Sequence, residues 1–255
     1  MNACVLLLAA ACGASRSNTP PANTANPDRF LYERGQTALK EEKWLDAREY
    51  FRQVVDNYPQ SPLRPDAKLG VGDAYMGEKG AENFVLAANE FSEFLTFYPQ
   101  NPRADYAQYR LAMSHFMQMR AADRDQTETR EALQEFEAFF TRFPKSPLTP
   151  EVRQKWREAR DRLSEHNYRV GYHYYRIRWY PGAIDRFREV LKDDPEFTGR
   201  DKVYFYLADS IVQSDNKRTP EALPYFQRVL DEFKTGEYVE KTQQRLQELK
   251  ELKLR

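Results

Sequence analysis

Residues 47–59 read Ala47-Arg-Glu-Tyr-Phe51-Arg-Gln-Val-Val-Asp-Asn-Tyr58-Pro59, and the spacing of Ala, Phe and Pro in them recurs along the chain. A Phe follows an Ala by four residues in four further copies: Ala87/Phe91, Ala132/Phe136, Ala183/Phe187 and Ala222/Phe226. A Pro lies eight residues after the Phe in the first four copies, and Lys234 takes its place in the fifth. Successive Phe residues are 39 to 51 residues apart, which is the period of helical repeat arrays.

Each copy fits the second helix of a two-helix unit. Residues four apart lie on the same face of a helix, so the small Ala lets a neighbouring helix approach and the Phe ring fills the space beside it. The Pro cannot continue a helix and it restricts the residue before it, so it ends the second helix. A small residue 12 to 20 positions before each Ala marks the first helix: Gly35, Gly72, Ala112, Gly171 and Ala208.

The pattern predicts an all-α fold: a solenoid of about five helix-turn-helix repeats over residues 29–255, with a C-terminal capping helix. The spacing of Gly171, Tyr174, Ala183, Phe187 and Pro195 resembles the tetratricopeptide repeat. We expect helix pairs at 29–41/44–57, 65–77/82–97, 102–119/127–142, 150–178/180–193 and 200–214/220–233, and a last helix from about residue 237. Asn101-Pro102, Thr149-Pro150 and Thr219-Pro220 each place a capping side chain before a Pro at the first helical position.

Composition and motifs argue against nucleic-acid binding and against catalysis. Lys and Arg together number 39, as do Asp and Glu, so the chain has no net charge to attract a polyanion. The three histidines, His115, His166 and His173, are dispersed, and no HExxH or CxxC motif is present. The carboxylates are scattered over charged helix faces. We therefore expect no enzyme activity, no cofactor and no metal site.

The first 28 residues differ from the rest. Val5-Leu-Leu-Leu-Ala-Ala-Ala11 is an apolar run too short to span a bilayer, and small residues precede Cys12. Residues 1–12 resemble a bacterial lipoprotein signal, although Ala9 stands where Leu is usual and no Lys or Arg precedes the apolar run. The resemblance implies that Cys12 carries the lipid; the alternative is an apolar leader that is not processed. Residues 13–28, rich in Ser, Asn, Thr, Ala and Pro, then form a flexible tether that spans on the order of 20 Å.

A family resemblance rests on the middle of the chain. The segment Asp123 to Ala132, the end Phe143-Pro-Lys-Ser-Pro147 and the run Tyr168 to Tyr175 resemble the third and fourth repeats of the BamD family. Its members are lipoprotein subunits of the BAM complex, the machine that folds β-barrels into the outer membrane. The resemblance also covers the leader, the tether and all five repeats.

This resemblance implies a non-catalytic scaffold, anchored by lipid to the periplasmic face of the outer membrane. It would dock on periplasmic domains of BamA, contact other BAM subunits and engage unfolded outer-membrane protein precursors. The alternative function is that of another periplasmic tetratricopeptide lipoprotein, which coordinates cell-wall synthesis or pilus assembly.

Two sets of candidate partner-binding residues follow. The resemblance implies that Arg186 docks on BamA, because an exposed guanidinium can form a bidentate pair with a carboxylate. Arg176 lies near it, in a stripe of cationic residues on the first helix of the fourth repeat. The loop Asp123-Arg124-Asp125 is the second set. For this loop the alternative is structural, namely that it caps the helix from residue 127 and holds the loop in place.

A peptide-binding groove is the remaining candidate site. In this repeat type, residues around the small position of the first helix line the concave face. In the fourth repeat these are Tyr168, Tyr172 and Tyr175, and Tyr32 is an equivalent in the first. Tyrosines offer rigid contact area and a hydrogen-bonding hydroxyl, which suits recognition of a peptide. The alternative is that these rings pack against the next repeat as ordinary core.

Overall fold

The computed structural model describes residues 19–253 of the chain, and their regular structure is helical throughout, which confirms the all-α class. The proposed lipid-attachment residue Cys12, the leader 1–12 and residues 13–18 of the predicted tether lie outside the described residues. The first helix begins at Pro27, so the last two residues of the predicted tether are helical.

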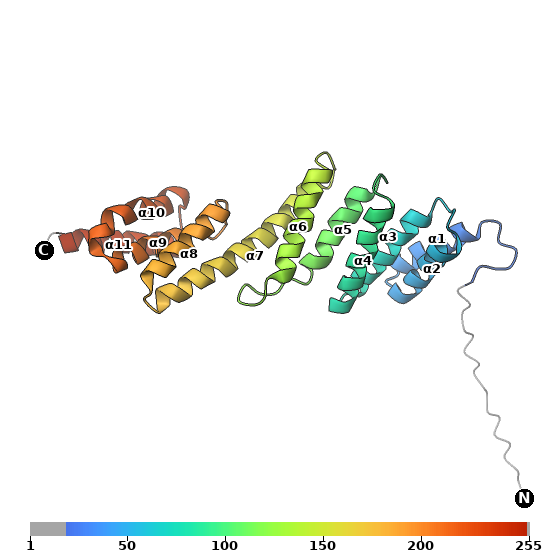
Figure 1. Ribbon diagram of the computed structural model, residues 1–255, viewed down its shortest axis with the longest axis horizontal. Helices are drawn as coiled ribbons and strands as arrows, with labels where there is room; N and C mark the ends of the chain where they lie inside the picture. The colour runs from blue at the N-terminus through green and yellow to red at the C-terminus, as the bar shows by residue number, and fades with distance from the viewer. Residues whose placement is uncertain (1–18, 254–255) are drawn as a thin grey trace, which may run out of the picture. The chain divides into compact units, whose positions relative to one another are not determined.

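The helices belong to two compact units, which divide between Lys79 and Gly80. The first unit contains α1 (Pro27–Lys40), α2 (Trp44–Asn57) and α3 (Arg64–Glu78). The second contains α4 (Ala81–Phe97), α5 (Ala104–Phe116), α6 (Thr127–Arg142), α7 (Thr149–Arg176), α8 (Tyr180–Asp193), α9 (Arg200–Ser214), the short 3-10 helix η1 (Asn216–Arg218), α10 (Thr219–Glu232) and α11 (Glu237–Lys253). Figure 1 labels these elements.

The predicted helical repeats are confirmed, with one difference in how they are grouped. The predicted bounds of the helices at 44–57, 127–142, 180–193 and 200–214 are those of α2, α6, α8 and α9. The two helices of the predicted second repeat, α3 and α4, fall in different units. Lys79 and Gly80 between them both have positive φ, 64° and 94°.

The recurring Ala and Phe residues form the cores of the repeats. All five Ala and all five Phe side chains have no exposed surface. The small residue of the first helix makes room for the ring: a Cβ on Gly35 would lie 2.6 Å from the Phe51 ring, and one on Gly171 would lie 2.8 Å from Phe187. Because such distances are below van der Waals contact, glycine at these positions allows the two helices to approach closely.

Helix α7 belongs to two neighbouring cores of the second unit. Its first half packs on α6, where Val152 and Ala159 contact the cluster around Phe136. Its second half packs on α8 and α9, and Tyr168 lies in the cluster around Phe187. Figure 1 shows this continuous helix running from α6 to α8. The cores of the third and fourth repeats are therefore joined by one continuous helix.

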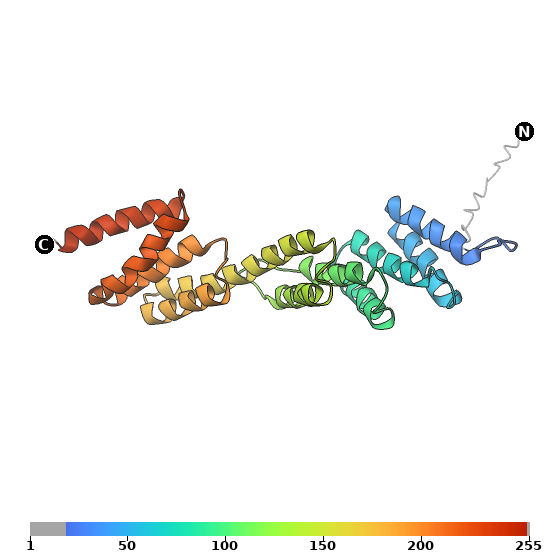
Figure 2. The ribbon, with the colours of Figure 1, turned by 90° about the horizontal axis from the view of Figure 1, so that it is seen from above.

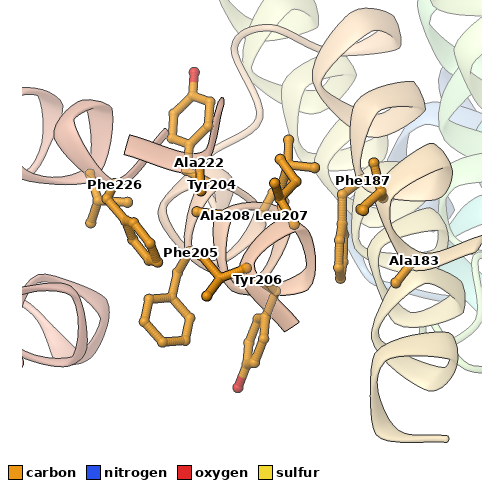
Figure 3. Close-up of a cluster of buried hydrophobic side chains, with 14 of the residues drawn as sticks. Ala183, Phe187, Tyr204, Phe205, Tyr206, Leu207, Ala208, Ala222 and Phe226 are labelled. Atoms are coloured by element: carbon orange, nitrogen blue, oxygen red, sulfur yellow. The ribbon is translucent and has the colours of Figure 1, made fainter. Parts of the chain in front are cut away.

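The last core is built around α9, which lies between α8 and α10. Figure 3 shows Phe187 of α8 on one side of α9 and Phe226 of α10 on the other, with Leu207 and Ala208 of α9 between them. Helix α11 follows α10 after a short turn and contacts α9 and α10, as expected of the predicted capping helix (Figure 2).

The capping prediction is wrong at all three sites. Asn101 lies before the N-terminal cap of α5, which is Arg103, and Thr149 and Thr219 are the first helical residues of α7 and α10; none of the three gives a side-chain cap. A different device links the two ends of a repeat. The Ser61 hydroxyl donates to Asp28 Oδ2 at 2.6 Å, and this hydrogen bond lowers the pKa of Asp28. Ser146 donates to Asp105 Oδ2 in the third repeat, also at 2.6 Å. In both repeats, the serine after the second helix therefore ties it to the start of the first.

Candidate functional site

Aromatic side chains from α7, α9 and α11 gather around Tyr206 of α9. Tyr168, Tyr172 and Tyr175 stand on one face of α7 because they are spaced by four and three residues, and consecutive rings stack at 5.9 and 6.2 Å. The Tyr206 ring meets those of Tyr172 and Tyr175 edge-on, each at 4.9 Å. Such edge-to-face arrangements are favourable pairings of aromatic rings.

The four tyrosines predicted to line a groove differ in their surroundings. Tyr168 is only 6% exposed and contacts Phe187, so it is part of the core. Tyr172 and Tyr175 are half-buried and keep an accessible edge. Tyr32 belongs to α1 in the first unit, where it packs on Phe51 at 5.7 Å and its hydroxyl accepts a hydrogen bond from Gln36. Tyr172 and Tyr175 are therefore the members of the set that form an accessible aromatic face on α7.

A buried carboxylate lies at the base of this aromatic face. Asp209 of α9 accepts a hydrogen bond from the Tyr175 hydroxyl at 2.6 Å and another from Arg245 Nε of α11 at 2.8 Å. Burial and the bond to Asp209 together raise the pKa of Tyr175, because both disfavour the phenolate. Tyr175 is thus held as a neutral hydrogen-bond donor. Arg245 supplies the positive charge that compensates Asp209.

Helix α11 covers part of the same face. Its Tyr238 ring lies 5.8 Å from both Phe205 and Tyr206. An open cavity of about 370 Å³ remains beside it, lined by Tyr175, Tyr206 and Asp209 and by Arg245 and other polar residues of α11. Sequence reasoning missed Tyr206, Asp209 and Arg245. The available signal was weak: Tyr206 stands two residues before the small residue Ala208 of the fifth repeat.

The turn between α7 and α8 presents cationic and apolar side chains together. Arg176 ends α7 and is exposed. Arg186 on α8 pairs with Glu189 at 2.7 Å, with side chains 48% and 57% exposed. In the turn itself, Ile177 and Trp179 are more than half exposed, at 58% and 53%. Exposed large apolar side chains beside arginines are typical of protein-binding surfaces.

The loop that contains Asp123, Arg124 and Asp125 connects α5 to α6 and exposes all three side chains. Asp125 accepts hydrogen bonds from the Thr127 amide and hydroxyl at the start of α6, and these bonds lower its pKa. The structural alternative for this loop therefore applies to Asp125. Asp123 and Arg124 remain available to a partner.

The loop is held by residues that the sequence did not single out. The buried Gln126 side chain donates to the carbonyl oxygens of Ala121 and Arg124 at 2.9 and 3.0 Å. From α7, His166 donates to the Ala122 carbonyl oxygen at 2.7 Å. Asp125 also borders an open cavity of about 490 Å³. The backbone is thus fixed while its acidic and basic side chains face solvent.

Between residues 19 and 253, no group of three or more His, Cys, Asp or Glu side chains is placed to hold a metal ion. Among the helices in that same range, none is long and apolar enough to cross a membrane.

Comparison with known proteins identifies the family. The family model described as YfiO, outer membrane lipoprotein, matches residues 24–210. The outer membrane protein assembly factor BamD of Caulobacter vibrioides is 28% identical, covering 88% of this chain and 74% of that protein. BamD of Vibrio cholerae is 24% identical, covering 71% and 78%. A solved structure, the TPR2AB-domain:pHSP90-complex of yeast Sti1, is similar with a TM-score of 0.48 and 11% identity, covering 81% of this chain and 77% of that one. Because the family model matches well over half of its residues, the chain belongs to the YfiO family of outer membrane lipoproteins.

Proposed function

We propose that the protein is a non-catalytic scaffold of outer-membrane protein assembly; its relatives are named outer membrane protein assembly factors. The match of the YfiO family model over residues 24–210 carries this proposal. The described repeats fit the role, since helical repeats serve as platforms that present partner-binding surfaces. Partners in this role are BamA, other subunits of the assembly machine, and unfolded outer-membrane protein precursors.

The surface proposed to dock on BamA lies at the turn between α7 and α8 and on the first half of α8, and is made of Arg176, Ile177, Trp179 and Arg186. Arg186 is paired only with an exposed neighbour on its own helix, and such surface pairs contribute little to stability. It can therefore exchange Glu189 for a carboxylate of BamA at small cost. Trp179 lies against Tyr174 at 4.7 Å, so its ring is held in place as an apolar anchor. The exposed Asp123 and Arg124 are a second contact.

The membrane attachment proposed is a lipid on Cys12, which lies outside the described residues. Helix α1 begins 15 residues later, at Pro27. The tether predicted from the sequence of residues 13–28 would let the repeats stand off the periplasmic face of the outer membrane. Precursors would be recognised by aromatic side chains with an accessible edge, Tyr172 and Tyr175 in the second unit and Tyr32 in the first.

The test is an affinity purification of the tagged protein from the membranes of its own organism, followed by mass spectrometry. We expect BamA among the partners and an acylated N-terminal peptide at Cys12. Arg186→Glu should reduce the recovery of BamA at least about tenfold, because it places a like charge opposite the partner's carboxylate. The control is Arg228→Glu on α10, where the arginine is also exposed and also paired with a glutamate of its own helix. Recovery of cell-wall or pilus proteins without BamA would refute the proposal.

A further inference from the structure

Helix α11 contacts the aromatic face as a bound helical peptide would. We use the name "tyrosine groove" for the surface that is formed by Tyr172 and Tyr175 of α7 and by Tyr206 and Asp209 of α9. Two residues of α11, seven positions apart and therefore on the same side of a helix, reach it. Tyr238 packs edge-on against Tyr206 at 5.8 Å, and Arg245 donates to Asp209 at 2.8 Å.

We propose that the tyrosine groove is a binding site for an amphipathic helix of a partner protein, and that α11 is its exchangeable occupant. The partner helix carries an aromatic residue and, seven residues later, an arginine. The groove dictates both: the Tyr206 ring takes the aromatic side chain, and the buried carboxylate of Asp209 requires a cation. This proposal rests on the scaffold function and specifies the ligand of Tyr172 and Tyr175: it is a helix, and an unfolded precursor binds there only where it forms one.

Helix α11 buries Val239 and Leu249 in the core cluster that contains Tyr206, but its fit to the groove is incomplete. The Thr242 hydroxyl of α11 is fully buried and has no hydrogen-bond partner among the described residues. A buried hydroxyl without a partner costs free energy that is recovered when the helix leaves. An open cavity of about 370 Å³ lies at the edge of this contact, lined by residues of α7, α9 and α11. A partner helix with an apolar residue at the position of Thr242 would avoid the unpaired hydroxyl, and a larger neighbouring side chain would fill the open cavity.

The connection to α10 allows α11 to move. The residues between the helices, Lys234, Thr235 and Gly236, are exposed. Gly236 has a φ of 130°, a conformation that glycine adopts without strain. Helix α10 keeps its own core contacts through Ala222, Phe226 and Val229, which are fully buried. Departure of α11 therefore leaves the fifth repeat with its Ala/Phe core.

The experiment uses the full chain and a labelled synthetic peptide of residues 237–253 as the probe. In the doubly substituted protein Tyr238→Ala/Arg245→Ala, the tethered α11 competes poorly. We expect fluorescence anisotropy to show the peptide binding this protein at least about tenfold more tightly than it binds the unsubstituted chain. A control peptide with Arg245→Ala should lose that gain. Adding Asp209→Asn to the doubly substituted protein should abolish it as well.

Equal binding of the peptide to both proteins, or to neither, would overturn the proposal. A second measurement on the unsubstituted chain does not depend on any variant being folded. Hydrogen exchange of the α11 amides should be at least about 100-fold faster than that of the α9 amides under native conditions. Equal protection of the two helices would mean that α11 is a permanent part of the core. Dimers that exchange α11 between copies, detected by light scattering, would also contradict a partner helix as the occupant.

Discussion

Replacing Asp194 by asparagine removes one of the two carboxylates that pair with Arg157, the one at the end of the fourth repeat. Asp194 is 4% exposed and stands where the first three repeats have Tyr58, Tyr98 and Phe143. Its carboxylate accepts two hydrogen bonds from Arg157 of α7, one of them at 3.0 Å, and one from Ser164 at 2.5 Å. Asparagine keeps the shape but loses the charge and one acceptor oxygen.

The expected cost follows from the burial of the pair. Breaking a buried ion pair by removing one partner costs about 3–5 kcal/mol. Arg157 is one-fifth exposed and keeps a second partner, Asp161, at 2.9 Å, so the cost here lies nearer to about 2–3 kcal/mol. For a unit of this size, that corresponds to a decrease in Tm of about 5–10 °C.

The assay is urea unfolding followed by circular dichroism, with Glu189→Gln as the matched control. Glu189 belongs to an exposed pair, so the same carboxylate-to-amide change there should alter stability by less than about 0.5 kcal/mol. If Asp194→Asn costs no more than Glu189→Gln, the Arg157 pair does not stabilise the fourth repeat and our reasoning is wrong.

The pH dependence gives an independent check. Burial alone would raise the pKa of Asp194, but the bonds from Arg157 and Ser164 outweigh it and hold the pKa below its ordinary value of 3.8. A lowered pKa in the folded state means that the stabilisation is complete above pH 3.8 and is lost as the pH falls through the folded-state value. The stability difference between the protein and Asp194→Asn should therefore be constant near neutrality and shrink below pH 3.8.

Two further substitutions test the packing of the repeats and the α5–α6 loop. Gly171→Ala should destabilise the second unit by about 1–3 kcal/mol in urea unfolding, because the new Cβ would lie 2.8 Å from the Phe187 ring. Helix propensity alone would favour alanine by about 1 kcal/mol. A stabilised variant would therefore contradict the packing argument. Gln126→Ala should lower the free energy of unfolding by about 1–3 kcal/mol and speed proteolysis of residues 121–126, since it removes the hydrogen bonds from this side chain to the loop. Asp123→Ala, at an exposed position of the same loop, should change neither the stability nor the rate of proteolysis.

The repeat architecture could be predicted because its determinants are local. Ala and Phe four residues apart share a helix face, and each Pro ends its helix, so the period of the motif is also the period of the fold. The same reasoning placed Tyr168, Tyr172 and Tyr175 side by side on α7, where their rings stack. It could not assign their burial, which depends on Tyr206 and Tyr238 from later helices.

What the sequence could not provide was the pairing of residues distant along the chain. Asp209 and Arg245 are 36 residues apart and meet only because α11 folds back on α9. His166 holds the α5–α6 loop through the carbonyl oxygen of Ala122, which lies 44 residues before it. The capping prediction failed for a local reason. It put Thr149 and Thr219 at the capping position just before each helix, whereas they are the first residues of α7 and α10. For one helix, a position error of a single residue is enough to change a cap into a first-turn residue.

Helix α7 is one continuous helix of 28 residues, so it determines how the fourth repeat is rotated relative to the third about the helix axis. Val152 and Ala159 face the third-repeat core, and Tyr168 and Gly171 face the fourth. A single residue inserted between these groups would turn everything after it by about 100° and move it by about 1.5 Å, which would take Gly171 away from Phe187. Seven inserted residues would restore the facing to within about 20° but lengthen the helix by about 10 Å. Length variation in this protein is therefore permitted in the turns between its helices, whereas inside α7 it is restricted to steps of whole turns.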